Sequence, residues 1–482
     1  MKNRQPIRAL RGFDDFAART MRAWNVPGMA VGIVLNGRTI HARGYGLRDV
    51  KHRLPVTEQT TFAIGSCTKA FTSTALGILV DEGKLGWDIP VRDYVPHFRL
   101  HDPVATKLAT CRDLLTHRTG LPRHDMVWVN TPLDRSRLFR RLRSLPFSRS
   151  FREAYQYNNL MYMAAGVVLE HVAGHPWEAF IEDRILRPLG MTSATFSNVD
   201  MARQPDFALG YDRSARRLVR VPHEPMMPVG PAGSMNVNIS DMCRWVTLHL
   251  AAGKVGRTKI VSPSVLRETH TACVAFREEP SYPELLDPGY ALGWTVQPYR
   301  GHRRLTHGGC VDGFNACTAF LPHDGIGVVV LTNVTSSPLP RLIAYGVYDR
   351  LLGLDPLAWS ARCRREEQAA KTKARKEAAQ NRAARKRGTR PSRPLAAYAG
   401  DYDHPGYGRL TVTCRDRRLY ATYNDAERPL EHYHDDVFEL VSRGTWPWRR
   451  KVTFQLGPRR RVIALAAALQ DGLAPLTFRR RP

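Results

Sequence analysis

The spacing of hydrophobic residues predicts a helix followed by a β-hairpin near the N-terminus. Residues 13–24 place apolar side chains on one helical face. The segments GMAVGIVL and RTIHARGYG flank Asn36-Gly37, a dipeptide typical of two-residue hairpin turns. A helical pattern then runs from Ser66 to about Glu82, where Gly83 closes it. Its apolar stripe predicts a helix that packs in the core.

Later segments predict further helices enclosed between strands. Helical spacing recurs at residues 111–120 and 160–172, and ACTAFLPHDGIGVVVLTN predicts two strands around Asp324-Gly325. Because strands near both ends of this region enclose the helices, we expect an α/β (α+β) sandwich, not a series of βαβ units. Its centre would be an antiparallel sheet flanked by helices.

The pattern changes twice toward the C-terminus. Residues 361–393 are dominated by Ala, Lys, Arg, Glu and Gln, which predicts a basic helix or a flexible linker. Short alternating runs such as GRLTVTC, RLYATY and KVTFQL follow, separated by turn residues. We therefore expect three parts: a main domain over 1–360, the linker over 361–393, and a small all-β barrel over 394–482.

Composition and charge restrict the function classes. With 482 residues, 43% of them hydrophobic, the chain is long enough for more than one core. The net charge is +28, and residues 361–393 contribute thirteen Lys or Arg against three Glu. Such a surface attracts polyanions, but no nucleic-acid-binding motif accompanies the charge. Nucleic-acid binding is therefore not expected as a main function.

Cysteine usage and hydropathy suggest a location. The eight cysteines are scattered and form no C-x-x-C pair, which is typical of reduced thiols. The N-terminal residues lack the apolar core of a secretory signal, and no stretch approaches 18 apolar residues. We expect a cytoplasmic protein without a membrane span.

Ser66-Cys67-Thr68-Lys69 is the strongest chemical signal. A serine hydroxyl becomes a good nucleophile only when a neighbour accepts its proton. A lysine three residues later on a helix lies one turn along the same face, and burial near other cations can lower its pKa. Among nineteen serines, this is the only S-x-x-K, and it follows a predicted strand and opens a helix.

Two further motifs are weak in isolation. Tyr157-Asn158-Asn159 is the only Y-x-N, and a loop tyrosine beside a helix-capping asparagine explains it equally well. His307-Gly308-Gly309 precedes a strand expected to start near Gly313, and such a triplet is usually a turn. Alternatively, its small residues let a substrate approach, and the Cys310 N–H pairs with that of Ser66 as an oxyanion hole.

Together, the order and spacing of these motifs resemble the class C β-lactamase and DD-peptidase superfamily of serine hydrolases. Y-x-N follows S-x-x-K after 91 residues, and H-G-G follows after a further 150. The segments FAIGSCTKAFTSTA, RDLLTHRTGLP and GPAGSMNVNISDMCRW also resemble this superfamily, over residues 10–350. LAAYAGDYDHPGYGRLTV and PLEHYHDDVFEL resemble the lipocalin-like barrel often appended to such hydrolases.

The resemblance implies a β-lactamase/transpeptidase-like fold and a set of site residues. Ser66 would form the acyl-enzyme, and Lys69 would be its base together with Tyr157, which also protonates the leaving group. Asn159 would position the substrate, and Gly309 and Cys310 would shape the oxyanion strand. His307 would stand where β-lactamases of this class carry lysine. No metal or organic cofactor is implied, and His404, His432 and His434 lack a recognisable metal-ligand spacing.

The histidine at position 307 bears on the substrate. A histidine with a pKa near 6.5 is only partly charged at neutral pH, whereas a permanent cation suits the carboxylate of a β-lactam. We therefore expect an esterase or a D-amino-acid or DD-type peptidase, acting on a small-molecule or peptide substrate. The alternatives are a true β-lactamase and a non-catalytic scaffold that binds anionic partners.

Two features leave alternatives open. The basic segment from Arg135 to Arg152 is expected to be a solvated helix face, or else to favour anionic acyl substrates. The C-terminal barrel would cover the mouth of the active site, or else mediate formation of a homo-oligomer.

Overall fold

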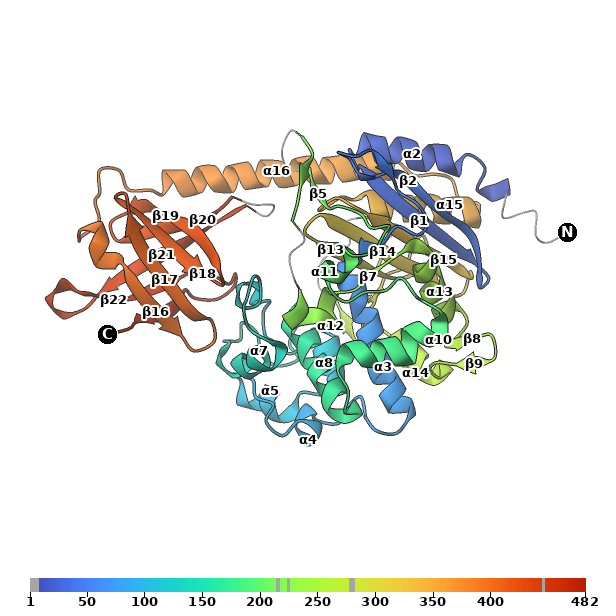
Figure 1. The fold of residues 1–482 in the computed structure, drawn as a ribbon, viewed down its shortest axis with the longest axis horizontal. Helices are drawn as coiled ribbons and strands as arrows, with labels where there is room; N and C mark the ends of the chain where they lie inside the picture. Colours follow the sequence, from blue (N-terminus) through green and yellow to red (C-terminus); the bar gives the residue numbers. More distant parts are fainter. Residues whose placement is uncertain (1–7, 214–216, 223–225, 277–281, 444–446) are drawn as a thin grey trace.

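A broad antiparallel sheet occupies the middle of the larger part of the molecule (Figure 1). The computed structural model describes residues 8–213, 217–222, 226–276, 282–443 and 447–482. Within these ranges nine strands follow one another across the sheet. In spatial order they are β10 (Val274–Ala275), β11 (Gly289–Tyr290), β12 (Thr295–Val296), β13 (Leu305–Val311), β14 (Phe314–Leu321), β15 (Ile326–Thr332), β1 (Gly28–Leu35), β2 (Arg38–Asp49) and β3 (Leu54–Pro55).

Helices cover both faces of this sheet because its central strands are apolar on both sides. Val328 and Val330 of β15 pack into one core, whereas Val329 and Leu331 pack into the other. The first core contains α2 (Phe13–Ala23) and α15 (Leu339–Leu352). On the opposite face, α13 (Ile239–Leu250) packs against β1 and β15, and α3 (Thr68–Asp81) and α8 (Asn159–Ala173) lie beyond it.

Short elements complete the helical side of the sheet. The helices are α4 (Val91–Tyr94), α5 (Pro103–Leu108), α6 (Cys111–Leu115), α7 (Arg135–Arg141), α9 (Trp177–Ile181), α10 (Arg187–Leu189), α11 (Asn198–Met201), α12 (Gly230–Gly233) and α14 (Pro263–Thr269). The strand pairs are β4 (Phe62–Ala63) with β7 (Asn236–Val237), β5 (Tyr211–Asp212) with β6 (Val219–Arg220), and β8 (Lys254–Val255) with β9 (Thr258–Lys259).

The predicted sandwich of an antiparallel sheet and flanking helices is confirmed. The hairpin also forms as expected, since β1 pairs with β2 across Asn36 and Gly37, whose φ angles of 49° and 73° suit a two-residue turn. The helix ending in a turn that was expected over 111–120 also forms: α6 ends at Leu115, and His117 in the following turn adopts a positive φ of 59°.

One sequence-based expectation was wrong. The triplet His307-Gly308-Gly309 does precede β14, the strand expected near Gly313, but it does not form a turn, because it lies in the middle of β13 and pairs with Thr318, Cys317 and Ala316 of β14. Glycines are poor strand formers, and they misled the sequence interpretation. Hydrogen bonding to the neighbouring strands β12 and β14 overrides that weak local preference.

A long helix and a barrel form the C-terminal part (Figure 1). The basic segment is helical in α16 (Trp359–Ala383), which buries Trp359 and Cys363 against the main domain. The described strands after it close into an eight-stranded barrel filled by aromatic and aliphatic side chains. They are β16 (Gly400–His404), β17 (Gly408–Arg415), β18 (Arg418–Tyr423), β19 (Ala426–His434), β20 (Val437–Ser442), β21 (Trp448–Leu456), β22 (Val462–Ala467) and β23 (Leu476–Arg480).

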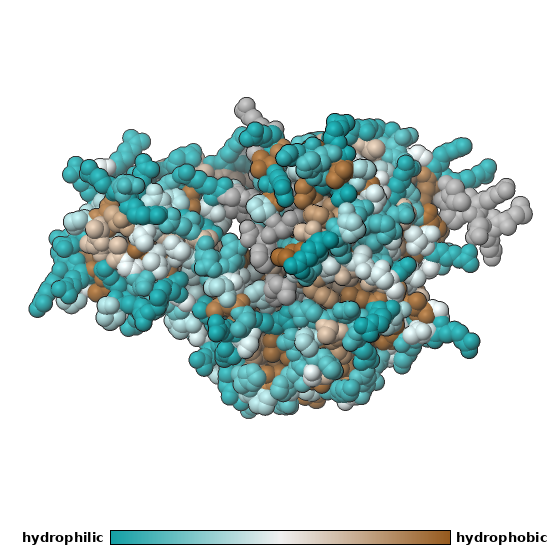
Figure 2. All heavy atoms as spheres, in the orientation of Figure 1, coloured by the Kyte–Doolittle hydropathy of each residue, from teal (hydrophilic) through white to brown (hydrophobic). Residues whose placement is uncertain are grey.

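The surface is largely hydrophilic on the face shown in Figure 2, over the main domain and over the barrel alike. Residues 368–380 of α16 are exposed throughout, so most of the basic charge of this helix is in contact with solvent. Within the described residues, no helix combines the length and the apolar character needed to cross a bilayer. All eight cysteines lie in the described ranges and are unpaired.

Buried histidines make the stability of this fold sensitive to acid. Burial is the largest cause that lowers the pKa of five of them: His117, His124, His249, His270 and His307. In the unfolded chain these histidines therefore bind protons as the pH falls below about 6.5, whereas in the folded chain they stay neutral. The free energy of unfolding should fall as pH drops from about 6.5 to 5, by up to ~1.4 kcal/mol per pH unit for each histidine.

Urea unfolding at pH 7.5, 6.0 and 5.0 measures this dependence. His270→Gln should flatten the slope, because it removes one buried site whose pKa is lowered to about 3. The matched control His101→Gln changes an exposed histidine and should leave the slope as it is. A free energy of unfolding that stays constant over this pH range would refute the prediction.

Candidate active site

Ser66 lies where a short 3₁₀ turn enters the central helix α3. The turn, η1 (Gly65–Cys67), leads directly into α3 and leaves Ser66 partly exposed. One helical turn later, Lys69 Nζ lies 2.9 Å from Ser66 Oγ. The S-x-x-K spacing therefore produces the expected contact between amine and hydroxyl.

Lys69 is completely buried, and its amine is fixed by two further partners. Nζ donates to Asn159 Oδ1 at 2.8 Å and to the Ala232 carbonyl oxygen at 2.7 Å. Both partners can only accept, so they occupy the two N–H groups of a neutral amine. The lone pair of a neutral Lys69 is then directed at Ser66 Oγ, as a proton acceptor requires.

The surroundings of Lys69 favour that neutral form. Its pKa is lowered well below the usual value, first because burial removes the ammonium from water, and second because of the positive charge of Arg123. The guanidinium of Arg123 lies 5.1 Å from the centre of the Tyr157 ring, and its Nε is bound to Asp125 Oδ2 at 2.6 Å. Arg123 was not identified from the sequence, although it directly follows the segment RDLLTHRTGLP.

Tyr157 approaches the serine from the other side. Its hydroxyl lies 2.6 Å from Ser66 Oγ, and burial raises its pKa, so the phenol stays protonated and donates to the serine. Lys69 Nζ lies 4.8 Å from the centre of the tyrosine ring. Ser66 Oγ is thus placed between a proton acceptor and a proton donor.

The start of α8 holds Tyr157 and Asn159 in place. Asn158, between them, caps the helix by accepting from Met161 N–H at 3.2 Å, so the capping interpretation applies to the middle residue of the motif. The Asn158 N–H donates to His117 Nδ1 at 3.1 Å, and the His117 ring packs 4.5 Å from that of Tyr157. His117 is a second supporting residue that the sequence motifs did not reveal.

Strand β13 approaches η1 very closely at Gly309. A Cβ atom at this position would lie 1.8 Å from the carbonyl oxygen of Ile64, so only glycine fits. A Cβ at Gly65 would likewise lie 2.9 Å from Cys310 N. This close approach brings the backbone nitrogens of Ser66 and Cys310 to the same edge of the site, where two N–H groups can bind an oxyanion.

His307 is part of this strand but does not contact the serine. Its Nδ1 donates to the carbonyl of Gly308 at 2.7 Å, and its Nε2 accepts from the Tyr290 hydroxyl at 2.8 Å. Burial, reinforced by Lys69, lowers its pKa to about 3. The imidazole is therefore neutral at physiological pH, in contrast to the partial charge that the sequence suggested.

The barrel reaches this site through the loop of residues 121–130. His124 Nε2 donates to the Pro146 carbonyl at 2.9 Å, so its Nδ1 accepts from the Tyr407 hydroxyl at 2.8 Å. Asn424 Nδ2 donates to the carbonyls of Met126 and Val129 at 2.9 and 3.1 Å. Since Arg123 belongs to this loop, the barrel supports a residue whose charge acts on Lys69.

Three arginines of the basic segment before Tyr157 make structural contacts, whereas Arg137, Arg140, Arg143 and Arg149 are exposed to solvent. Arg135 pairs with Glu170 and Glu178, and Arg152 pairs with Asp113 at 2.7 Å. Arg141 donates to the Tyr407 carbonyl at 3.1 Å and so also contacts the barrel. The described residues contain no cluster of three His, Cys, Asp or Glu side chains that could hold a metal ion.

Comparison with known proteins assigns this fold and site to a class. The beta-lactamase family model matches residues 13–349, and a domain of unknown function (DUF3471) matches residues 384–480, which include the barrel. The chain belongs to the beta-lactamase family and is a β-lactamase-related serine hydrolase with a penicillin-binding-protein-like fold.

Individual relatives agree with this assignment. The chain is 31% identical to the unguisins hydrolase ungD' of Aspergillus campestris over 87% of this chain and 81% of the relative. It is 25% identical to protein flp of Staphylococcus aureus over 69% and 64% of the two chains. The octameric penicillin-binding protein homologue from Pyrococcus abyssi superposes with a TM-score of 0.64 at 23% identity, covering 98% of this chain and all of that one.

The Arg123 charge should be visible in the pH dependence of hydrolysis. Because Arg123 lowers the pKa of Lys69, Arg123→Gln should raise that pKa and move the ascending limb of kcat/KM to higher pH. The profile is measured with a p-nitrophenyl ester from pH 5 to 10. Arg137→Gln, on the exposed side of α7, is the control and should leave the limb unmoved. An unchanged limb in Arg123→Gln would contradict this role.

The barrel contact should be needed for full activity. Asn424→Ala removes the hydrogen bonds from its Nδ2 to the carbonyls of Met126, Val127 and Val129. Each contributes about 1 kcal/mol, so kcat/KM should fall about three- to tenfold while the fold is retained. Asn381→Ala removes a comparable bond, from α16 to Glu439 of the barrel, away from this loop. Equal kcat/KM values for the two variants would show that the loop contact does not support the site.

Proposed function

We propose that this protein hydrolyses ester or amide bonds through an acyl-enzyme on Ser66. The observation that carries the proposal is the arrangement around one hydroxyl, with Lys69 Nζ at 2.9 Å and Tyr157 OH at 2.6 Å from Ser66 Oγ. A neutral amine and a protonated phenol are the two groups that an acyl transfer needs, a base for the nucleophile and an acid for the leaving group. The relative named unguisins hydrolase supports a hydrolytic activity.

In the acylation step, Ser66 Oγ attacks the substrate carbonyl carbon while its proton passes to Lys69 Nζ. The N–H groups of Ser66 and Cys310 bind the resulting oxyanion. The bond to the leaving alcohol or amine then breaks, Tyr157 gives that group a proton, and Lys69 returns one to Tyr157. Asn159, whose Oδ1 is engaged by Lys69, uses its Nδ2 to hold a substrate carbonyl.

In the deacylation step, water replaces the departed leaving group. Tyr157 passes its own proton to Lys69 Nζ as it takes one from the water, whose oxygen attacks the acyl carbon. The bond from the acyl carbon to Ser66 Oγ then breaks, and Lys69 returns its extra proton to Oγ. The products are a free carboxylic acid and the regenerated serine.

The neutral, hydrogen-bonded imidazole of His307 favours simple esters and peptides, including D-configured ones, as substrates over β-lactams. Both imidazole nitrogens are engaged, and the low pKa keeps the ring uncharged. A neutral, occupied imidazole cannot offer the carboxylate of a β-lactam the permanent cation that a lysine would. Efficient β-lactamase activity is therefore the weaker alternative.

A non-catalytic scaffold would not need the buried Lys69. A lysine with no exposed surface carries a large desolvation cost, which an apolar side chain would avoid. The exposed basic stretch of α16 is compatible with binding of anionic partners, but it does not explain this amine. The hydrolase proposal accounts for both the burial and the hydrogen bonds of Lys69.

Covalent labelling tests the proposal directly. A fluorophosphonate probe should add its mass to Ser66, and both Ser66→Ala and Lys69→Ala should abolish labelling. Ser73→Ala is the matched control, since Ser73 is a buried serine of the same helix and should leave labelling intact. Folded protein that is not labelled, or is labelled elsewhere, would refute the acyl-enzyme.

The rates at which the enzyme hydrolyses esters and a β-lactam then distinguish the two substrate classes. Hydrolysis of p-nitrophenyl esters should exceed that of nitrocefin, and Tyr157→Phe should lower kcat for the esters about 10²-fold by removing only the hydroxyl. Faster turnover of nitrocefin than of the esters would favour the β-lactamase alternative.

A further inference from the structure

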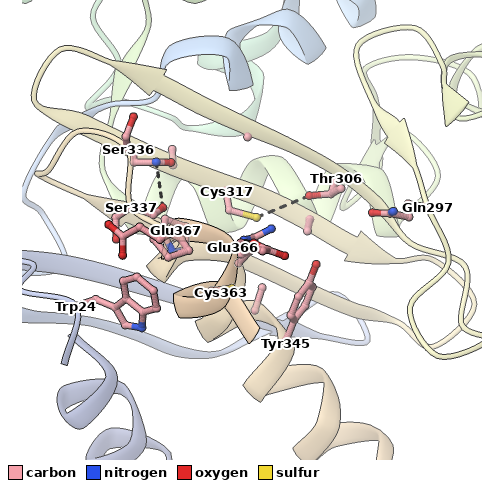
Figure 3. Close-up of a pocket in the computed structure, with 18 of the residues that line it drawn as sticks. Trp24, Gln297, Thr306, Cys317, Ser336, Ser337, Tyr345, Cys363, Glu366 and Glu367 are labelled. Atoms are coloured by element: carbon pink, nitrogen blue, oxygen red, sulfur yellow. Dashed lines mark hydrogen bonds and ion pairs between the residues drawn. The ribbon is translucent and has the colours of Figure 1, made fainter. Parts of the chain in front are cut away.

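A second cavity lies behind the sheet, on the face opposite Ser66. Its volume is about 610 Å³, enough for a small organic molecule. Strands β13 and β14 form one wall, and α15 and the first turns of α16 form the other (Figure 3). Trp24, which follows α2, lies at one side.

Successive residues of β13 point to opposite faces of the sheet, and this separates the cavity from the active site. Thr306 and Gly308 line the cavity, whereas the intervening His307 and the following Gly309 face η1 and the serine. Thr306 and Gly308 pair with Ala319 and Cys317 of β14, which line the cavity as well. One strand thus provides a wall to each site.

The cavity contains a buried cation without a carboxylate partner. Arg304 is 4% exposed, and among the described residues no carboxylate oxygen lies within 4.0 Å of its guanidinium. Its Nη2 donates to Gln297 Oε1 at 2.6 Å, and its guanidinium carbon lies 5.3 Å from the centre of the Tyr345 ring. Its Nε has no hydrogen-bond partner in the described part of the chain.

A buried hydroxyl lies in the same lining. Tyr348 is completely buried, and its OH has no hydrogen-bond partner among the described residues. The Nε of Arg213, another lining residue, is also unsatisfied among the described residues. Buried donors and charges are costly when left unsatisfied, so this lining indicates a missing ligand with acceptor oxygens. A guanidinium with free donors recognises such oxygens when they carry negative charge.

The charges of the lining indicate a monoanion. Arg213 Nη2 lies 3.5 Å from Glu367 Oε1, and Arg341 forms an ion pair with Glu366. The charges of these two arginines are therefore balanced by the two glutamates. The three arginines and two glutamates of the lining leave one positive charge, that of Arg304. A ligand with a single negative charge balances it, whereas the second negative charge of a phosphate dianion would find no counter-charge in the lining.

We propose that this cavity binds a small organic monocarboxylate. Its carboxylate accepts from the guanidinium of Arg304, and its apolar body packs against Pro340, Ala344 and Tyr345. The site is independent of the acyl-enzyme chemistry at Ser66, because ligand and serine lie on opposite faces of β13.

Titration of the full chain with 4-fluorobenzoate, followed by ¹⁹F NMR, tests this proposal. Arg304→Gln should weaken binding at least tenfold, and Arg304→Lys should weaken it less. Arg303→Gln is the matched control, since Arg303 donates to the His270 carbonyl instead of lining the cavity, and it should change binding less than twofold. 4-Fluorobenzyl alcohol, which lacks the charge, should bind at least tenfold more weakly than the carboxylate.

One further variant and one labelling experiment complete the test. Ala344→Phe fills the cavity without removing Arg304 and should also abolish binding, which decides the matter if Arg304→Gln does not fold. Prior labelling of Ser66 with fluorophosphonate should leave binding unchanged. The proposal is overturned if wild-type protein does not bind 4-fluorobenzoate, if the Ser66 label blocks binding, or if inorganic phosphate binds more tightly.

Discussion

The burial of one amine is the constraint on which the site depends. Lys69 has no exposed surface, so its charge cannot be stabilised by water, and the nearby Arg123 makes the charged form still less favourable. The amine is kept in place by acceptors from two other parts of the chain, Asn159 on α8 and Ala232 on α12. Helices α3, α8 and α12 therefore have to pack accurately before Ser66 has a proton acceptor.

Small residues let the sheet take part in the same arrangement. Gly309 allows β13 to approach η1 to a distance at which no side chain fits. The Cys67 Sγ, which donates to the His307 carbonyl at 3.2 Å, joins the two elements directly. The hydroxyl of Ser66, the amine of Lys69 and strand β13 are consequently parts of one packed unit.

The sequence predicted the residues around Ser66 better than it predicted their states. S-x-x-K and Y-x-N are local patterns, and local helix geometry is enough to place Lys69 and to start α8 at Asn159. The class of fold followed from the order of strands and helices. His307 was different, because its neutral state arises from burial, and its partner Tyr290 reaches it only after β11 and β13 join the same sheet. Long-range burial of this kind leaves no periodic signal in the sequence.

The same limit explains why Arg123 and the barrel contact were missed. Arg123 follows a turn and belongs to no motif, and its effect on Lys69 arises from the position of its loop in space. That loop is held from outside by His124 on Tyr407 and by Asn424, residues about 280 and 300 positions away from it in the chain. The barrel is therefore more than an appended domain, because its contacts fix the loop that carries a charge next to the catalytic amine. A hydrolase domain without the barrel would retain Ser66 and Lys69, but the loop that carries Arg123 would lose its support.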